Sequence, residues 1–129
     1  MNELAERWLA FAREDLLVAE AIMEDEIFNQ VCFHSQQSVE KALKGALVNR
    51  GVAPPRTHSI TDLLSLFPPE WPIDLRNDLI GLDDFYIPTR YPDALPGSLP
   101  DGMPGVTEAK EALALAQATL QQVNLLISS

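Results

Sequence analysis

Apolar residues recur at three- and four-residue steps along the first part of the chain, which is the spacing of one face of an α-helix. Between Glu3 and about Glu24 the apolar positions of this face are Leu4, Trp8, Phe11, Ala12, Ala19, Ile22 and Met23. A second helix is predicted from about Phe28 to Arg50, because Gly51 and a pair of prolines follow in the order expected at a helix end. The first half of the chain therefore predicts two long amphipathic helices.

Three further helices are predicted in the second half. A short helix follows a cap at His58 or Ser59 and ends before the prolines at 68–69. Another begins near position 72, with Gly81 as a possible interruption, and a long one runs from about 106 to 127 after an N-cap at Thr107. The segment at about 87–105 is rich in Pro and Gly and is predicted to be a loop.

No segment of useful length alternates as a strand does. The expected fold class is therefore all-α, an up-and-down antiparallel bundle of three long and two short helices. A length of 129 residues suits one domain with one core, so residues 1–129 are predicted to form a single domain.

The charge balance limits the partners that this chain can attract. Nineteen acidic and nine basic residues give a net charge of −10, which opposes a general coating of nucleic acid. Within 27–61, however, four basic residues face only Glu40, so an anion is expected to bind there if anywhere. No run is apolar enough for a membrane span, and a cytoplasmic location is expected. The lone Cys32 reads as a small buried residue.

Two candidate buried polar residues are Asp15 and His58. Asp15 falls between apolar positions of the first helix, where an unpaired charge would be costly. It is expected to meet a cation, a hydrogen-bond donor or a neighbouring subunit, although a structural ion pair or a half-exposed edge position explains it as well.

A row of polar residues marks the second helix. His34, Gln37, Lys41 and Lys44 follow one another at steps of three, four and three residues, which places them within about 80° of one another around the helix. Such a ridge suits an anion or the acidic residues of a second copy. A solvated helix face explains the same pattern equally well.

The start of the predicted loop carries a second group of candidates, Tyr86, Arg90, Tyr91 and Asp93. The guanidinium of Arg90 suits a phosphate or carboxylate, and the tyrosines suit stacking on a base. A locked loop whose tyrosines complete the core is the alternative. No metal-ligand spacing, phosphate-binding glycine loop or nucleophile motif is present, so no metal, no cofactor and no catalytic residue are predicted.

Four segments in order, WLAFAREDLLVA (8–19), CFHSQQSVEKALK (32–44), HSITDLL (58–64) and YIPTRYPD (86–93), resemble the HEPN family, whose name abbreviates higher eukaryotes and prokaryotes nucleotide-binding. The resemblance covers nearly the whole chain. It implies an up-and-down helical bundle, frequent homodimers, and association with minimal nucleotidyltransferases in two-component systems of the toxin–antitoxin kind.

Many relatives are metal-independent RNases with an Arg followed after four to six residues by a His. Here the positions that follow Arg90 at that spacing are Leu95, Pro96 and Gly97, and no other Arg fits. The leading hypothesis is therefore a homodimeric module that binds a nucleotide or a nucleotidyltransferase. The alternatives are an RNase in which His34 or His58 replaces the missing residue, and a purely structural or assembly protein.

Overall fold

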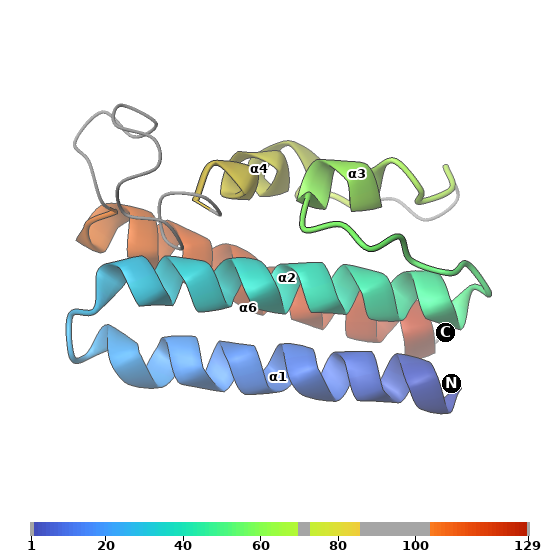
Figure 1. Ribbon diagram of the computed structural model, residues 1–129, viewed down its shortest axis with the longest axis horizontal. Helices are drawn as coiled ribbons and strands as arrows, with labels where there is room; N and C mark the ends of the chain where they lie inside the picture. The colour runs from blue at the N-terminus through green and yellow to red at the C-terminus, as the bar shows by residue number, and fades with distance from the viewer. Residues whose placement is uncertain (1, 70–72, 86–103, 129) are drawn as a thin grey trace.

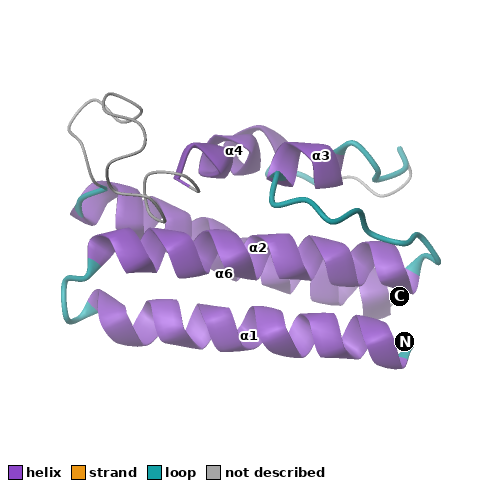
Figure 2. Cartoon of the chain, in the orientation of Figure 1, coloured by secondary structure: helices purple, strands orange, loops and turns teal. Residues whose placement is uncertain are grey.

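The computed structural model describes residues 2–69, 73–85 and 104–128, and the regular elements of this described part are all helices. They are α1 (Glu3–Met23), α2 (Phe28–Asn49), α3 (Ile60–Leu64), α4 (Arg76–Ile80), the 3₁₀-helix η1 (Gly81–Phe85) and α6 (Val106–Ser128). Within these residues there is no strand, as Figure 2 shows. The predicted all-α fold of long and short helices is confirmed.

The helices form an up-and-down bundle around α2. Figure 1 shows α1 antiparallel to α2 on one side, with α3 and α4 along the opposite side and α6 behind. Both α1 and α6 pack directly on α2, and α3 and η1 also contact it. Because α6 returns in the direction of α2, the two ends of the chain lie at the same end of the bundle (Figure 1).

The helix ends follow from local chemistry. The side chain of Asn2 accepts a hydrogen bond from the Ala5 amide at 2.7 Å and so caps α1. Gly51, just after α2, has a φ of +83°, a conformation that costs glycine little. Ser59, one of the two predicted caps, caps α3 by accepting a hydrogen bond from the Asp62 amide at 3.2 Å.

The predicted cap of the last helix was wrong by two positions. Helix α6 already begins at Val106, so Thr107 lies inside its first turn. The carbonyl of Gly105 accepts from the Ala109 amide at 3.0 Å, and the Glu108 carboxylate accepts from the Gly105 amide at 3.1 Å. Glu108 therefore performs the capping that the sequence assigned to a threonine hydroxyl, because a side chain in the first turn can fold back onto the preceding amide.

The core lies between α2 and its neighbours, with α2 as the most enclosed element. Every residue of α2 from Ser35 to Val48 is buried except Lys41. Helix α1 approaches closely because its buried face carries the small residues Ala5, Ala12 and Ala19. At Gly45 of α2 an added Cβ would lie 3.2 Å from side-chain atoms of α1, so a glycine permits this approach.

One expectation about α1 was wrong. Leu4 and Phe11 were predicted on the buried face, yet they are 54% and 52% exposed. The buried face instead centres on Leu9 and the three alanines, about one residue further round the helix. The apolar sector of α1 is wider than the face that α2 covers, so its outer edge stays in solvent.

The second half of the chain wraps the remaining side of α2. The predicted fourth helix is divided: α4 ends at Ile80, Gly81 is its C-cap, and η1 continues the chain. Leu79 of α4 and Leu82 of η1 are both buried. Most of the predicted Pro/Gly-rich loop falls outside the described residues, and none of the described helices is long and apolar enough to cross a membrane.

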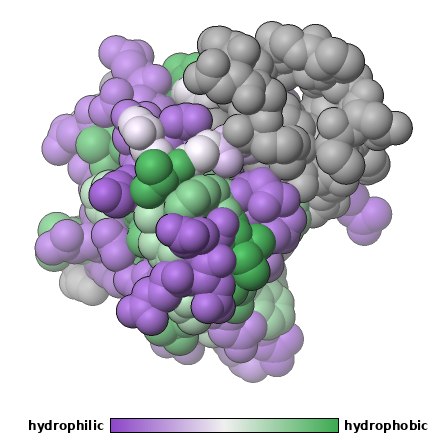
Figure 3. All heavy atoms as spheres, turned by 90° about the vertical axis from the view of Figure 1, so that its left-hand side faces the viewer, coloured by the Kyte–Doolittle hydropathy of each residue, from purple (hydrophilic) through white to green (hydrophobic). Residues whose placement is uncertain are grey.

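The end of the bundle where α1 leads into α2 faces the viewer in Figure 3. Its surface is mostly hydrophilic, with apolar residues gathered in separate patches. Ile27, in the turn between the two helices, is 43% exposed. At this end of the bundle the exposed apolar residues are therefore local, and the visible surface has the mixed character usual for a folded domain in water.

Candidate functional site

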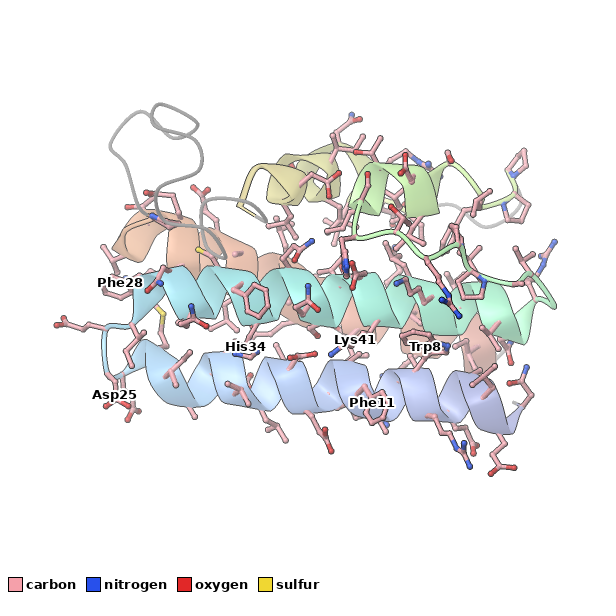
Figure 4. All side chains as sticks on the ribbon, viewed as in Figure 1. Trp8, Phe11, Asp25, Phe28, His34 and Lys41 are labelled. Atoms are coloured by element: carbon pink, nitrogen blue, oxygen red, sulfur yellow. The ribbon has the colours of Figure 1, made fainter. Side chains whose placement is uncertain are left out.

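Helices α1 and α2 together build a cluster around Asp15. His34 and Lys41 lie seven residues apart, and therefore two turns apart, on the edge of α2 that faces α1. The Asp15 carboxylate lies 2.9 Å from Nδ1 of His34 with one oxygen and accepts from Nζ of Lys41 at 2.5 Å with the other. Figure 4 shows His34 and Lys41 along this shared edge. The sequence expectation that Asp15 meets a cation holds in the structure.

Asp15 stays ionised although it is largely buried. Burial alone would raise its pKa, but the hydrogen bonds and charges of His34 and Lys41 outweigh burial and hold the pKa below its ordinary value. The side chain of Asp15 is 12% exposed, while those of His34 and Lys41 are 25% and 27% exposed. One ionised carboxylate thus orients two nitrogen groups that still reach solvent.

A second cluster of the same composition lies on the other flank of α2. The carboxylate of Glu40 lies 3.0 Å from Nδ1 of His58 and 4.0 Å from Nζ of Lys44. Burial is the dominant influence and raises the pKa of Glu40, although Lys44 and His58 act in the opposite direction. Helix α2 therefore contributes residues to two clusters, each made of a carboxylate, a histidine and a lysine.

The prediction that His58 is buried was wrong, because its side chain is 54% exposed and the buried member of the pair is Glu40. Sequence reasoning missed Glu40 as a site residue. Its signal was present: it is the only acid in the basic stretch 27–61. A single carboxylate among four cations can be buried more readily than an isolated one, because a cation is near enough to pair with it.

The predicted polar ridge is not a continuous exposed surface. Gln37 and Lys44 are each only 7% exposed, and α1, α3 and α6 all pack against the helix that carries them. Gln37 donates to Gln36 Oε1 at 3.1 Å, and Gln36 donates to the His58 carbonyl at 3.2 Å. His34 and Lys41 remain the accessible pair of the four.

Lys44 also contacts an aromatic ring. Its Nζ lies 5.4 Å from the centroid of the Trp8 ring, within cation–π range. Lys44 therefore has two partners, the Trp8 ring and the Glu40 carboxylate. Lys44 therefore suits a structural role, whereas Lys41 combines one partner in Asp15 with access to solvent.

Tyr86, Arg90, Tyr91 and Asp93 lie outside the described residues, so the second group of candidates has no structural account. A nearby acid that the sequence did not single out is Asp83 of η1. Its carboxylate accepts from the Ile60 and Thr61 amides at 2.7 and 3.1 Å, and from the Ser59 and Thr61 hydroxyls. Asp83 therefore fixes η1 to the start of α3 and serves the fold.

Cys32 lies inside the core, as predicted. Burial raises the pKa of its thiol to about 12, and the charge of Glu108 adds to the effect. At neutral pH the thiol is therefore not a nucleophile. Among the residues that the structure describes, no group of three or more His, Cys, Asp or Glu side chains is placed to hold a metal ion.

Comparison with known proteins decides the family. The family model for the HEPN domain matches residues 5–126, which is nearly all of the chain. The chain belongs to the HEPN domain family. Two crystal structures of similar proteins support this: TT1696 from Thermus thermophilus and ST0689, an archaeal HEPN homologue. A search of curated proteins found no match.

Both structural relatives resemble the chain from end to end. TT1696 is 39% identical with a TM-score of 0.84, and the match covers 98% of this chain and 99% of that one. ST0689 is 32% identical with a TM-score of 0.75 at the same coverage. The helical bundle described above is thus a HEPN fold, with the Asp15 cluster at the contact of its first two helices.

Proposed function

We propose that this HEPN protein is a homodimeric binding module that takes a nucleotide at the Asp15 cluster and pairs with a minimal nucleotidyltransferase. The nucleotide and the nucleotidyltransferase are suggested by the family resemblance in the chain's motifs. The Asp15 cluster supplies the physical basis for the nucleotide, and the partner protein is tested separately.

The observation that carries this proposal is that one carboxylate orients two solvent-accessible nitrogen groups. Lys41 has three N–H donors and uses one toward Asp15, so two remain for a phosphate. Asp15 engages Nδ1 of His34, which leaves Nε2 on the outer side of the ring. When His34 is protonated the cluster carries one net positive charge, in a chain whose total is −10.

Titration of the purified protein with ATP and with a short single-stranded RNA at low salt tests the proposal. Lys41→Ala is expected to weaken nucleotide binding about tenfold or more, since a charged hydrogen bond contributes about 1.5–3 kcal/mol. Arg90→Ala tests the second group of candidates. Lys110→Ala is the matched control, because Lys110 is an exposed lysine of α6 away from the cluster.

Equal affinities for wild type, Lys41→Ala and Lys110→Ala would contradict a nucleotide site at Asp15. Failure of both ATP and RNA to bind would leave an assembly role as the better account. The nucleotidyltransferase is tested separately, by mixing the protein with a minimal nucleotidyltransferase encoded in the same genome. A stable complex in size-exclusion chromatography with light scattering supports the pairing, and two separate peaks contradict it.

RNA cleavage without a metal is a second candidate function, favoured by one observation. In the Asp15–His34 pair the carboxylate holds Nδ1, an arrangement that leaves Nε2 to act as a general acid or base. Incubation of the protein with RNA in EDTA tests it. Cleavage that His34→Ala abolishes would establish the RNase, whereas intact RNA after saturable binding supports the binding module.

A further inference from the structure

An open groove lies between α4 and α6, away from the Asp15 cluster. Its volume of about 590 Å³ is within the range of small-molecule sites. Helix α4 lies across α2 from α1 (Figure 1), so the groove is separate from the contact of α1 with α2 that holds Asp15. The groove is lined by Leu75, Asp78, Glu111, Ala114, Leu115 and Ala118.

The two walls of the groove follow from the spacing of their residues. On α6, Glu111, Leu115 and Ala118 are separated by four and three positions, so they lie along one face of the helix. On the opposite wall Leu75, the N-cap of α4, and Asp78 are three positions apart and are neighbours in the same way. The groove therefore has apolar leucine and alanine side chains at its base and one carboxylate on each helix.

A side-chain hydrogen bond sets how the two walls face each other. The Gln122 amide of α6 donates to the Asp74 carboxylate at 3.3 Å. From there Asp78 is one turn further along the chain, and Ala118 is one turn back. Because the chain passes through α4 in the direction opposite to α6 (Figure 1), Asp78 faces α6 near Ala118. Glu111 is seven residues before Ala118, which separates the two carboxylates by about 10 Å along the groove.

The two groove carboxylates have no cationic partner among the residues that the structure describes. Asp78 and Glu111 are both exposed, and no ion pair of these residues includes either of them. Arg76 is close along the chain, but its guanidinium donates to the Leu64 carbonyl at 2.8 Å. Lys110 is about 100° around α6 from Glu111. The groove therefore combines apolar surface with two negative charges that a ligand can neutralise.

We propose that this groove binds an aliphatic polyamine, with one ammonium group at Asp78, another at Glu111 and the methylene chain against the leucines and alanines between them. A metal ion would leave the apolar base uncovered, and a wholly apolar ligand would remove water from two carboxylates without replacing its hydrogen bonds. A polyamine meets both requirements, because its ammonium groups donate to carboxylates and its methylene groups cover apolar surface. This site goes beyond the proposed function, since it takes a cation on a different face from the nucleotide site.

Titration at low ionic strength, followed by NMR of the backbone amides, tests the site. Spermidine is expected to give saturable shifts that are largest in α4 and in the groove-lining turns of α6. Diaminooctane, diaminobutane and Mg²⁺ carry equal charge and differ in length and apolar surface. Diaminooctane is expected to bind about threefold or more tightly than the other two, because it alone reaches both carboxylates and covers the base of the groove. Equal affinities of these three ligands, or shifts spread over the whole surface, would overturn the proposal.

Removal of the two carboxylates tests their part in binding. The double variant Asp78→Asn, Glu111→Gln is expected to weaken spermidine binding about fivefold to tenfold, the scale of two exposed ion pairs. Glu14→Gln with Asp25→Asn is the matched control, because both are exposed acids far from the groove. Each double variant removes two acids and changes the net charge from −10 to −8. Equal losses in the two variants would show general attraction to an acidic protein and would overturn the site.

Filling the groove tests the apolar base without a change of charge. Ala114 is exposed, so the ring of Ala114→Phe occupies the groove and does not enter the core. Spermidine binding is expected to weaken about tenfold. Ala10→Phe, at an exposed alanine of α1, is the control and should bind as wild type does. Unchanged affinity of Ala114→Phe would overturn the proposal, and circular dichroism checks that each variant is folded.

Discussion

The Asp15 and Glu40 clusters contain the same three kinds of side chain, yet their carboxylates respond to burial in opposite directions. Asp15 has a lowered pKa and Glu40 a raised one. At Asp15 both oxygens have a nitrogen within hydrogen-bond distance, at 2.9 and 2.5 Å. At Glu40 His58 is equally near, but Lys44 is at 4.0 Å and the carboxylate is only 3% exposed.

The comparison teaches that the identity of the neighbours does not decide the protonation of a buried carboxylate. A direct contact from lysine offsets the loss of solvent at Asp15, whereas a lysine one ångström or more further away does not offset it at Glu40. The ionised carboxylate of Asp15 therefore stabilises the fold. Ionisation of Glu40 lowers the stability of the fold, because its burial is not fully offset by its neighbours.

The largest effect is expected from Asp15→Asn, which leaves Lys41 and His34 without their carboxylate. The free energy of unfolding at pH 7 should fall by about 2 kcal/mol, the scale of hydrogen bonds to charged groups. Because the pKa of Asp15 is lower folded than unfolded, its contribution is present above the unfolded value and lost as the pH falls through the folded one. Urea unfolding at pH 7 and pH 3 checks this.

The loss should therefore shrink as the pH falls below the ordinary pKa of an aspartate toward pH 3, because the unfolded chain then takes up the proton before the folded one. Asp25→Asn is the control, because Asp25 is an exposed acid in the turn after α1. A loss of stability that is the same at both pH values would show that Asp15 acts through its shape and not through its charge.

A smaller effect separates the two lysines. Lys41→Met removes a cation in direct contact with Asp15 and should cost about 1–2 kcal/mol. Lys44→Met should cost less than about 1 kcal/mol, since the methionine keeps the apolar stem beside Trp8 and loses only a distant charge. Thermal or urea unfolding of both variants ranks them, and a larger loss for Lys44→Met would reverse our view of the two clusters.

Glu40→Gln should act in the opposite direction to Asp15→Asn. A carboxyl with a raised folded pKa favours the fold below its unfolded pKa and loses that stability as the pH rises through the folded value. The amide oxygen of Gln can still accept from His58 without a buried charge. We expect a gain of up to about 1 kcal/mol at pH 7 that disappears near pH 4. Urea unfolding at both pH values measures it, and a destabilised variant at pH 7 would contradict this.

The smallest effect is expected from Gly45→Ala. The new Cβ would lie 3.2 Å from Cβ of Trp8 and from Cδ2 of Leu9, so α1 must move away from α2 by a few tenths of an ångström. Better helix propensity of alanine, about 1 kcal/mol, offsets much of that cost. The net change in the free energy of unfolding should stay below about 1 kcal/mol. The movement of α1 is expected to weaken the Asp15 cluster more than the Glu40 cluster, because Asp15 lies on α1. A reduced pH dependence of unfolding between pH 3 and 5 would show this.

The candidate site was only partly predictable. The helical wheel placed Asp15 in an apolar sector and so predicted a partner for it, and it placed His34 and Lys41 on one edge of a second helix. Joining the two required the antiparallel contact of α1 with α2. The wheel also grouped Gln37 and Lys44 with them, because angles around one helix carry no information on which elements cover it.

The sequence by itself determined the helices and the fold class. Periodic apolar residues, caps such as Asn2 and Ser59, and breakers such as Gly51 act over a few residues, so their effect can be read along the chain. It also determined the family, since the motifs that resemble HEPN are local runs of residues.

Only the tertiary structure decided which half of the α1 apolar sector is buried, which histidine is exposed, and which carboxylate carries a stable charge. Each outcome depends on distances between residues that are far apart in the sequence. The separations of 18 residues between His58 and Glu40, and of 26 between Lys41 and Asp15, are spanned by helix packing. Burial and ion pairing act through space, so the depth of a carboxylate and its distance from a lysine together set the direction of its pKa shift, and no pattern along the chain encodes either quantity.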